Sequence, residues 1–443
     1  RYERYKDSGV EWIGEIPEHW EINKLKRLSN IITGNTPPKS EEENYDDEGI
    51  PWVKPDNIQD DGTISETKER LSVIGLQKAR LIPKSSAIVC CIGTVGKVGF
   101  TQEDCTTNQQ INSIIFERPS IWNNKYGFYC LCSSKNEHEK YSNKVVVSIL
   151  NKTQQGNILM PVPSLKEQKA IASFLDQKTA EIDDLIADKE KLIELLQEKR
   201  QVIITEAVTK GLNPNVRMKD SGIEWIGEIP EHWKVTKVKY YYDVCLGKMI
   251  QPNQEDYSDT LEYYLCAINV TWDGIDISNL KEMWFSNEDK KKYSIKSGDL
   301  IVCEGGDAGR ASIWDGSVEN CYIQNAVHRV REKKSSSNKY LYYWLYFLKH
   351  AGYTDLICNK ATIMHYTYEK FLNTILVLPD LDEQRKIVYY LDEKIAEINS
   401  LKKEIEEQLQ KLKEYRQSLI SEAVTGKIDV REFENKDGVI YSE

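Results

Sequence analysis

Two stretches of the chain have the pattern of long helices. Residues 166–208 are rich in Ala, Glu, Lys, Leu and Gln and contain no Gly or Pro, so helix propensity is high throughout. A rise of about 1.5 Å per residue makes this stretch a rod of about 64 Å. Pro163 precedes its start and Gly211 lies just past its end. A second stretch of the same kind follows Pro379.

Apolar residues recur in both stretches with heptad spacing. One core position holds Leu175, Ile182, Leu196 and Ile203 in the first stretch, and Leu391, Ile398, Ile405, Leu412 and Leu419 in the second. The companion position holds Ile171, Leu185 and Leu192, then Ile387, Leu401 and Tyr415, and is interrupted by Lys178, Lys199, Lys394 and Gln408. This pattern predicts an antiparallel coiled coil with a variable domain at each end, related by a pseudo-two-fold axis. The alternative is that each helix packs only on its own domain.

The regions between the helices are predicted to be mixed α/β domains. Short apolar or alternating runs at 86–92, 111–116, 299–303 and 326–330 are typical of strands. Residues 34–38, 60–62 and 273–274 carry Gly, Pro, Asn and Asp, which mark loops. The clustered tyrosines at 240–242 and 340–346 are expected to be mainly core or partner-facing positions.

The chain is an internal tandem repeat. The box KDSGVEWIGEIPEHW at residues 6–20 recurs at 219–233 with one change, Val10 to Ile223. The segment from Pro163 matches the segment from Pro379, and both end in Glu-Ala-Val-Thr. Each copy therefore runs from a box, through a variable region, to a long helix.

The two variable regions resemble each other only faintly. The pairs that match are Gly34 with Gly247, Asn57 with Asn269, Cys90 with Cys303, Gly96-Lys97 with Gly309-Arg310, and Gln109-Gln110 with Gln324-Asn325. We infer that the fold was kept while the surface diverged, as in a protein that recognises two different features in a fixed relation.

Composition limits the class of protein. A length of 443 residues suits about two to four domains. With 40% hydrophobic and 29% charged residues, no stretch of about 18 or more apolar residues occurs, so we expect a soluble cytoplasmic protein with no membrane span or signal peptide. The ten cysteines form no CxxC pair, which favours buried thiols over a metal site.

The formal net charge of -11 argues against a chain that coats DNA as a polycation. DNA binding then requires basic residues to gather on one face, or other subunits to supply most phosphate contacts.

Polar residues in or beside the predicted loops are candidates for contacts with DNA bases. Arg and Lys suit guanine, and Asn and Gln suit adenine, in the major groove. The alternative for each is an ordinary surface or turn-stabilising side chain. The candidates are Lys39, Lys54, Asn57, Lys97, Gln109 and Gln110 in the first region, and Lys248, Asn269, Arg310, Gln324, Asn325 and His365 in the second.

Several motifs resemble catalytic sites without completing them. Residues 93–98 lack the first Gly and the Ser or Thr of a phosphate loop. Residues 35–38 are not the Asn-Pro-Pro-aromatic tetrapeptide of adenine methyltransferases. Asp56, Glu66 and Lys68 imitate a metal-dependent nuclease core, but the second repeat has no equivalent. No catalytic residue and no metal ligand is therefore predicted.

The duplicated Glu-His-Trp triplets contain His19 and His232, for which acid–base work is the functional interpretation. Packing is favoured, because Trp12, Ile13 and Trp20 make each box a hydrophobic clasp that joins a variable domain to the helices.

These boxes, the Pro-x-Leu-x-Glu-Gln helix openings and the Glu-Ala-Val-Thr endings together resemble the specificity (S) subunit of Type I restriction-modification systems, over essentially the whole chain. The resemblance implies a non-catalytic DNA-binding subunit, with two target-recognition domains on a helical spacer. Each domain would recognise one half of a bipartite double-stranded target, the halves lying roughly one helical turn, 34–36 Å, apart.

The resemblance also implies partners and their cofactors. Two methyltransferase subunits using S-adenosylmethionine, and ATP-driven restriction and translocase subunits requiring Mg, would dock on this chain, which itself binds no cofactor. It divides the chain into a box at 1–23, a recognition domain at 24–162, a central helix at 163–218, a second box at 219–235, a second recognition domain at 236–378, and a distal helix with a tail at 379–443.

Two other classes of function compete with this interpretation. An autonomous metal-dependent DNA endonuclease with two DNA-binding halves predicts cleavage by the isolated chain and its loss on Asp56→Ala. A coiled-coil scaffold without a nucleic-acid role predicts salt-insensitive partner binding and no affinity for duplex DNA.

Overall fold

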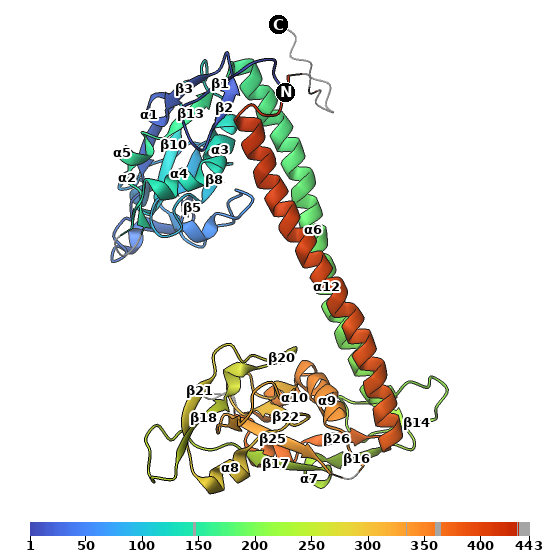
Figure 1. Cartoon of the computed structure of the whole chain (residues 1–443). Coiled ribbons are helices and arrows are strands. Elements are labelled where there is room, and N and C mark those ends of the chain that lie inside the picture. The colour runs from blue at the N-terminus through green and yellow to red at the C-terminus, as the bar shows by residue number, and fades with distance from the viewer. Residues whose placement is uncertain (145–147, 334, 359–364, 432, 434–443) are drawn as a thin grey trace. The chain divides into compact units, whose positions relative to one another are not determined.

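The structure is a computed structural model that describes residues 1–144, 148–333, 335–358, 365–431 and 433. It consists of two compact units (Figure 1). One contains Arg1–Glu190 and Glu406–Glu443, and the other contains Lys191–Ile405. Each unit joins a mixed α/β domain to segments of the same two long helices. Among the described residues, no helix has the length and apolar character needed to cross a bilayer.

The first unit is built around a four-stranded antiparallel sheet in the order β4-β10-β7-β8, formed by Asn30–Thr33, Ile111–Ile115, Ala87–Cys90 and Val98–Phe100. A second sheet, β6-β5-β9, is formed by Arg70–Leu71, Tyr45–Val53 and Thr106–Thr107, and its β5–β9 pair is parallel. Three antiparallel strand pairs complete it: β1-β2 (Tyr5–Asp7, Glu15–Pro17), β3-β13 (Glu21–Lys24, Leu159–Val162) and β11-β12 (Asn143–Lys144, Ser148–Ile149). Its short helices are α1 (Leu25–Leu28), η1 (Glu42–Asn44), η2 (Pro55–Asn57), α2 (Val73–Gln77), α3 (Asn124–Ser133), α4 (Lys135–Lys140) and α5 (Lys152–Gln155).

The second unit repeats this topology. Its four-stranded sheet β17-β25-β22-β23 is formed by Tyr242–Leu246, Val327–Glu332, Leu300–Cys303 and Ala311–Ile313. Its three-stranded sheet β21-β18-β24 is formed by Lys281–Phe285, Thr260–Leu265 and Tyr322–Ile323, again with one parallel pair. The strand pairs are β14-β15 (Met218–Asp220, Glu228–Pro230), β16-β26 (Lys234–Lys237, Ile375–Leu378) and β19-β20 (Val270–Thr271, Gly274–Ile275). Its short helices are α7 (Val238–Tyr241), η3 (Ala267–Asn269), α8 (Asn287–Tyr293), α9 (Asn338–His350), α10 (Tyr353–Ile357) and α11 (Tyr368–Leu372).

The four predicted strand runs are confirmed as β7, β10, β22 and β25. Residues 34–38 and 60–62 form loops as expected. The 273–274 signal is only half right, because Gly274 begins β20 after the tight turn at Trp272-Asp273. The ten cysteines are free thiols, most of them buried.

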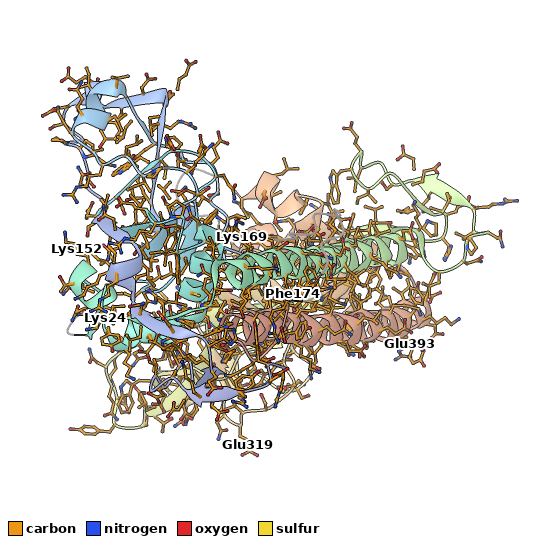
Figure 2. The ribbon with its side chains drawn as sticks, turned by 90° about the horizontal axis from the view of Figure 1, so that it is seen from above. Lys24, Lys152, Lys169, Phe174, Glu319 and Glu393 are labelled. Atoms are coloured by element: carbon orange, nitrogen blue, oxygen red, sulfur yellow. The ribbon has the colours of Figure 1, made fainter. Side chains whose placement is uncertain are left out.

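The long helices are α6 (Leu165–Lys210) and α12 (Leu381–Val424). A side chain caps each start: the Glu167 amide donates to Ser164 Oγ over 3.3 Å, and the Glu383 amide donates to Asp380 Oδ1 over 2.9 Å. In both units α6 and α12 lie side by side (Figures 1 and 2).

The predicted antiparallel pairing is present within the first unit. Asp183 of α6 pairs with Arg416 of α12, whereas Lys189, further along α6, donates to Gln408, which lies earlier in α12. The residue numbers therefore rise along one helix as they fall along the other, which defines an antiparallel pair.

The heptad prediction is correct for one position, whereas for its companion it is correct only at Ile171 and Ile387, which are buried. Leu175, Ile182 and Leu196, with Leu391, Ile398, Ile405 and Leu419, are buried as expected. The predicted companions Leu185, Leu192, Leu401 and Tyr415 are instead 43–58% exposed. The second inner position lies four residues after the first, at Thr179, Ile186, Ile193, Arg200 and Ala207 in α6 and at Ile395, Lys402, Leu409, Arg416 and Ala423 in α12. The sequence favoured the wrong second position because lysine and arginine occupy some of the inner places there, while apolar residues occupy exposed ones.

Backbone hydrogen bonds test the faint residue matches between the variable regions. The match of Cys90 with Cys303 is supported, because their amides make equivalent hydrogen bonds. The Cys90 amide donates to Lys97 O over 2.8 Å, and the Cys303 amide donates to Arg310 O over 2.7 Å. The match of Gln109-Gln110 with Gln324-Asn325 is wrong by one residue. The Gln110 amide donates to Asn108 Oδ1 as the Ala326 amide donates to Gln324 Oε1, so Asn108-Gln109 is the equivalent of Gln324-Asn325.

Candidate nucleic-acid interface

Two loops meet at one edge of each recognition domain, and we call this place the paired-loop edge. It consists of residues 34–36 with 108–110 in the first domain, and of residues 247–249 with 324–326 in the second. Asn35 N donates to Thr107 O over 3.0 Å, and Lys248 N donates to Ile323 O over 2.9 Å. A Cβ on Gly34 or Gly247 would collide with the facing backbone carbonyls, so both loops approach closely only through glycine.

The side chains on this shared backbone frame differ between the domains. In the first, Thr36 Oγ1 donates to the exposed Gln109, and Asn108 Nδ2 donates to Gln110 Oε1 over 2.9 Å. In the second, Gln324 donates to Asn325, and Lys248 takes the place of Asn35. The same geometry thus presents two different sets of donors and acceptors.

A cluster of charges adjoins the edge in the first domain. Lys39 and Lys54 both contact Glu69, at 3.2 and 2.8 Å. Lys54 Nζ also lies 4.6 Å from the Trp52 ring centroid, and Trp52 Nε1 donates to Asn35 O over 3.2 Å. The hydrogen bond from Lys54, with a further one from Lys39, holds the pKa of Glu69 below its ordinary value.

Further cations lie at the end of an equivalent short helix in each domain. Ser72 caps α2 and Ser286 caps α8. After α2, Lys78 O accepts a hydrogen bond from Asn35 Nδ2 over 2.6 Å, and Arg80 donates to Thr33 O. In the second domain, α8 carries lysines at 290–292, and its Asp289 forms an ion pair with Lys248 of the edge.

Two of the twelve candidates hold turns. Asn57 Oδ1 accepts from the Lys54 amide over 2.9 Å, and its Nδ2 donates to Glu66 O over 3.3 Å. Asn269 makes the same contacts, accepting from the Cys266 amide over 3.0 Å and donating to Asp276 O over 3.0 Å. Both the oxygen and the nitrogen of each side-chain amide are therefore hydrogen-bonded within the turn, which favours the turn-stabilising alternative for these two residues.

The remaining candidates have other partners. Lys97 lies 3.6 Å from Asp60. Arg310 donates to Ala267 O over 2.9 Å and lies 3.5 Å from Asp307. His365 is exposed, and its ring lies beside Gly305. The structure therefore brings Lys39 and Lys54 together, Gln109 beside Gln110, and Lys248 beside Gln324 and Asn325, but not all twelve.

Sequence reasoning missed several members of this surface. The Gly34 and Gly247 match located the frame, but not the neighbours that the fold adds from distant segments. The missed residues are Asn35, Thr36, Trp52, Glu69, Lys78, Arg80 and Asn108 in the first domain, and Lys290, Lys291 and Lys292 in the second.

The net charge is unevenly distributed along the chain. Residues 24–162 and 236–378 contain nearly equal numbers of acidic and basic residues. The acidic excess lies in the two boxes and in the segment from 379 onward. The recognition domains therefore do not share the acidity of the whole chain, which eases the conflict with DNA binding.

No part of the described structure supports the nuclease alternative. Within the ranges that the structure describes, no group of three or more His, Cys, Asp or Glu side chains is placed to hold a metal ion. Asp56 and Glu66 are both exposed.

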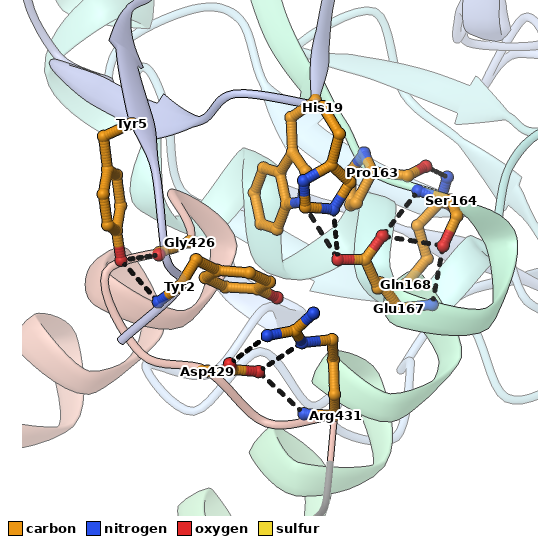
Figure 3. Close-up of polar contacts among 11 residues, drawn as sticks. Tyr2, Tyr5, His19, Pro163, Ser164, Glu167, Gln168, Gly426, Asp429 and Arg431 are labelled. Carbon is orange, nitrogen blue, oxygen red and sulfur yellow. Dashed lines mark hydrogen bonds and ion pairs between the residues drawn. The ribbon is translucent and has the colours of Figure 1, made fainter.

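Each box is attached to a long helix through one glutamate, and Figure 3 shows this attachment for the first box. Glu167 Oε1 receives hydrogen bonds from His19 Nε2 over 2.9 Å and from Trp20 Nε1 over 3.2 Å, while its other oxygen accepts from Ser164 Oγ over 2.7 Å. Burial alone raises the pKa of Glu167, but these hydrogen bonds outweigh it and lower the pKa below its ordinary value. Glu383 repeats the contacts with His232 and Trp233, at 2.8 and 2.9 Å.

The histidines of the boxes are therefore more than packing groups. Their side chains are half exposed, at 52% and 50%, and each is hydrogen-bonded to the glutamate in the first turn of a long helix. The tryptophans, Trp20 and Trp233, are fully buried, as the predicted hydrophobic clasp requires.

The recognition domains are held on the helices by duplicated tyrosines. The Tyr126 hydroxyl donates to Pro161 O and Val424 O over 3.1 and 3.2 Å. The Tyr129 hydroxyl donates to Asp176 over 2.7 Å. In the second unit Tyr340 and Tyr343 take these places, the latter donating to Asp392 over 2.8 Å.

The two units repeat one fold and one attachment of box to helix, but their paired-loop edges carry different polar side chains. This combination defines a tandem recognition module. The model of the Type I restriction modification DNA specificity domain matches residues 17–195 and 230–411. The chain belongs to this family and contains the domain twice.

Relatives that are named as specificity subunits match over nearly the whole chain. The putative type I restriction enzyme MjaX specificity subunit of Methanocaldococcus jannaschii is 26% identical, over 95% of this chain and 96% of its own. The type I restriction enzyme EcoBI specificity subunit of Escherichia coli is 24% identical, over 95% and 89%. A structure solved in a study of complex assembly and conformational transition of the type I R-M system shares the fold, with a TM-score of 0.70 and 16% identity over 93% of this chain and 99% of that one.

Proposed function

We propose that this chain selects the DNA target of a Type I restriction-modification complex. Each recognition domain binds one half of a bipartite duplex site, and the chain itself catalyses no reaction. Membership of the specificity family and the two copies of its domain support this role.

The observation that carries the proposal is the pair of paired-loop edges. Their backbone hydrogen bonds are equivalent, but the first presents Asn35, Thr36 and Gln109 where the second presents Lys248, Met249 and Asn325. A shared frame with different side chains is suited to two different base sequences. A scaffold without a nucleic-acid role needs neither the frame nor the difference.

The two groups of residues at each edge have different roles in this proposal. Gln109 in the first domain, and Lys248 with Asn325 in the second, contact base edges. The phosphates are contacted by cations that flank each edge. These are Lys78 and Arg80, just after α2 in the first domain, and the lysines at 290–292 on α8 in the second. Asn57 and Asn269 support the turns beneath.

The partners follow from the role. Two methyltransferase subunits, which use S-adenosylmethionine, and restriction or translocase subunits, which use ATP and Mg, assemble with this chain in the cytoplasm. Those subunits hold the cofactors.

The test is to co-express the chain with the proteins encoded beside it and to map adenine methylation in the host DNA by single-molecule sequencing. We expect one bipartite motif with a fixed gap, which disappears when the gene for this chain is deleted. Gln109→Ala should then relax one half of the motif and Asn325→Ala the other, each by about 1–3 kcal/mol of base discrimination.

Other outcomes would contradict the proposal. A stable complex that leaves no methylated motif favours the scaffold. Metal-dependent cleavage by the purified chain, lost on Asp56→Ala, favours the nuclease. If Gln109→Ala changed both halves of the motif, the two domains would not be independent modules.

A further inference from the structure

Two arginines occupy the same place in the two repeats. Arg200 and Arg416 each stand six residues before the first residue of the Glu-Ala-Val-Thr ending, in the segments RQVIITEAVT and RQSLISEAVT. Both lie at the second inner position of the helix pair, where Ile193 and Leu409 lie one heptad earlier. Their side chains are only 12% and 14% exposed.

An arginine at an inner position of a helix pair destabilises the pair unless its charge and its hydrogen-bond donors are satisfied. Both arginines find their partners partly or wholly outside the helices, in the adjoining recognition domain. This arrangement points to a role beyond holding the helices together.

In the first unit Arg416 joins three segments. Its Nε and Nη2 donate to the Asp183 carboxylate of α6 over 2.7 and 2.9 Å. The same Nη2 donates over 3.1 Å to the backbone carbonyl of Asp61, in a loop of the recognition domain. The next residue, Gln417, donates to Cys132 O at the end of α3 over 3.3 Å.

In the second unit Arg200 reaches the corresponding loop by different chemistry. Its Nη1 donates to the Asp273 carboxylate over 2.8 Å, and its guanidinium lies 5.2 Å from the centroid of the Tyr346 ring on α9. Trp272, beside Asp273, packs edge-on against Tyr346 at 5.0 Å. Asn399 stands at the repeat position of Asp183, so the loop carboxylate is the partner here.

The two loops are equivalent. Asp61 and Asp273 each follow by four residues the asparagine, Asn57 or Asn269, that holds the preceding turn. In both units, therefore, an inner arginine of a long helix is hydrogen-bonded to the equivalent loop of the recognition domain.

We propose that Arg416 and Arg200 are positioning residues that fix the angle of each recognition domain on the helices and thereby set the spacing between the two half-sites. This inference rests on the proposed function. The duplicated tyrosines attach each domain at the ends of the helices, and a second attachment at the loop prevents rotation about the first. A domain held at one place only accepts more than one spacing.

Lysine substitutions separate this role from charge. In Arg416→Lys the positive charge remains beside Asp183, but one ammonium group lacks the rigid fork that reaches both Asp183 and Asp61. Arg200→Lys is the second variant. Lys413→Ala is the matched control, because Lys413 also bridges the helices, contacting Glu190 at 3.3 Å, but both of these side chains are more than half exposed.

The measurement is the methylation map of cells that contain the whole complex with each variant. For Arg416→Lys and Arg200→Lys we expect both half-sequences to be unchanged and the preference for the native gap over gaps one base pair longer or shorter to fall by about tenfold, because a binding constellation whose support is loosened tolerates misplacement. Lys413→Ala should keep the native gap preference.

An unchanged gap preference in a folded arginine variant would overturn the inference, even if methylation became weaker overall. Asp273→Asn provides a second route if the arginine variants do not fold, because Asp273 is 62% exposed and asparagine keeps a side-chain oxygen that can accept from Arg200. A wild-type complex with no bipartite motif would instead refute the proposed function, so the two failures are distinguishable.

Discussion

Replacing Glu167 with glutamine is expected to weaken the attachment of the first box to α6 by about 2 kcal/mol. A hydrogen bond to a charged group contributes about 1.5–3 kcal/mol, and glutamine retains only one of the two acceptor oxygens. Glu167 is 8% exposed and accepts from His19, Trp20 and Ser164, so water does not replace the lost bonds.

The second unit supplies a graded comparison. Glu383 accepts the same bonds from His232 and Trp233 but is 25% exposed, so Glu383→Gln should cost less. Glu194→Gln is a surface control, because the Lys191–Glu194 pair is more than 60% exposed on both sides and such pairs contribute about 0–1 kcal/mol.

Native-state hydrogen exchange of peptides covering residues 2–20 and 219–233 measures these effects separately. A loss of 2 kcal/mol corresponds to an increase of about 30-fold in exchange through local opening. We expect this increase at residues 2–20 in Glu167→Gln and little change at 219–233. Equal increases in both peptides, or none in the first, would refute the role of Glu167 as a local joint.

The stability of the attachment between the first box and α6 should depend on pH in a defined direction. Because the pKa of folded Glu167 lies below its ordinary value of about 4.3, its stabilising contribution is present above that pH and is lost as the pH falls through the lower, folded pKa. The Trp20 indole resonance, followed by NMR, should shift in this acidic range in the native chain but not in Glu167→Gln.

Three further predictions follow from the helices, the loop edge and the buried histidines. Leu196→Lys should destabilise the helix pair strongly, by the several kcal/mol expected for an unpaired buried charge. Leu192→Lys should change the thermal midpoint little, since Leu192 is 43% exposed. Equal effects of the two substitutions would contradict the corrected register. Arg80→Ala should weaken binding to all duplexes about equally and lower the salt dependence by about one phosphate contact, as seen in titrations at several salt concentrations, and a change in sequence preference would place Arg80 on a base instead. Burial lowers the pKa of His138 and of His328 to about 4, so each folded ring stays neutral while the unfolded chain takes up protons. Stability should therefore fall as the pH is lowered from about 6.5 to about 4, and an NMR titration showing either ring protonated at pH 6 would contradict this.

The sequence by itself determined the repeat, the fold class and the helices. Repetition of the boxes and of the helix segments is visible without structure, and the helices could be bounded to within a few residues because Pro163 and Gly211 cannot continue them. The main heptad position was also correct, since buried apolar residues at a fixed spacing leave a periodic signal.

Only the tertiary structure decided which residues meet. The register of the second inner position was hidden because Arg200 and Arg416 are polar in sequence, and their partners Asp273, Asp183 and a loop carbonyl are brought to them only by the fold. The turn role of Asn57 and the grouping of Lys39, Lys54 and Glu69 are likewise hydrogen-bond and charge contacts between separated segments. Local patterns record burial and propensity, whereas partners in such contacts are set by the packing of the whole domain.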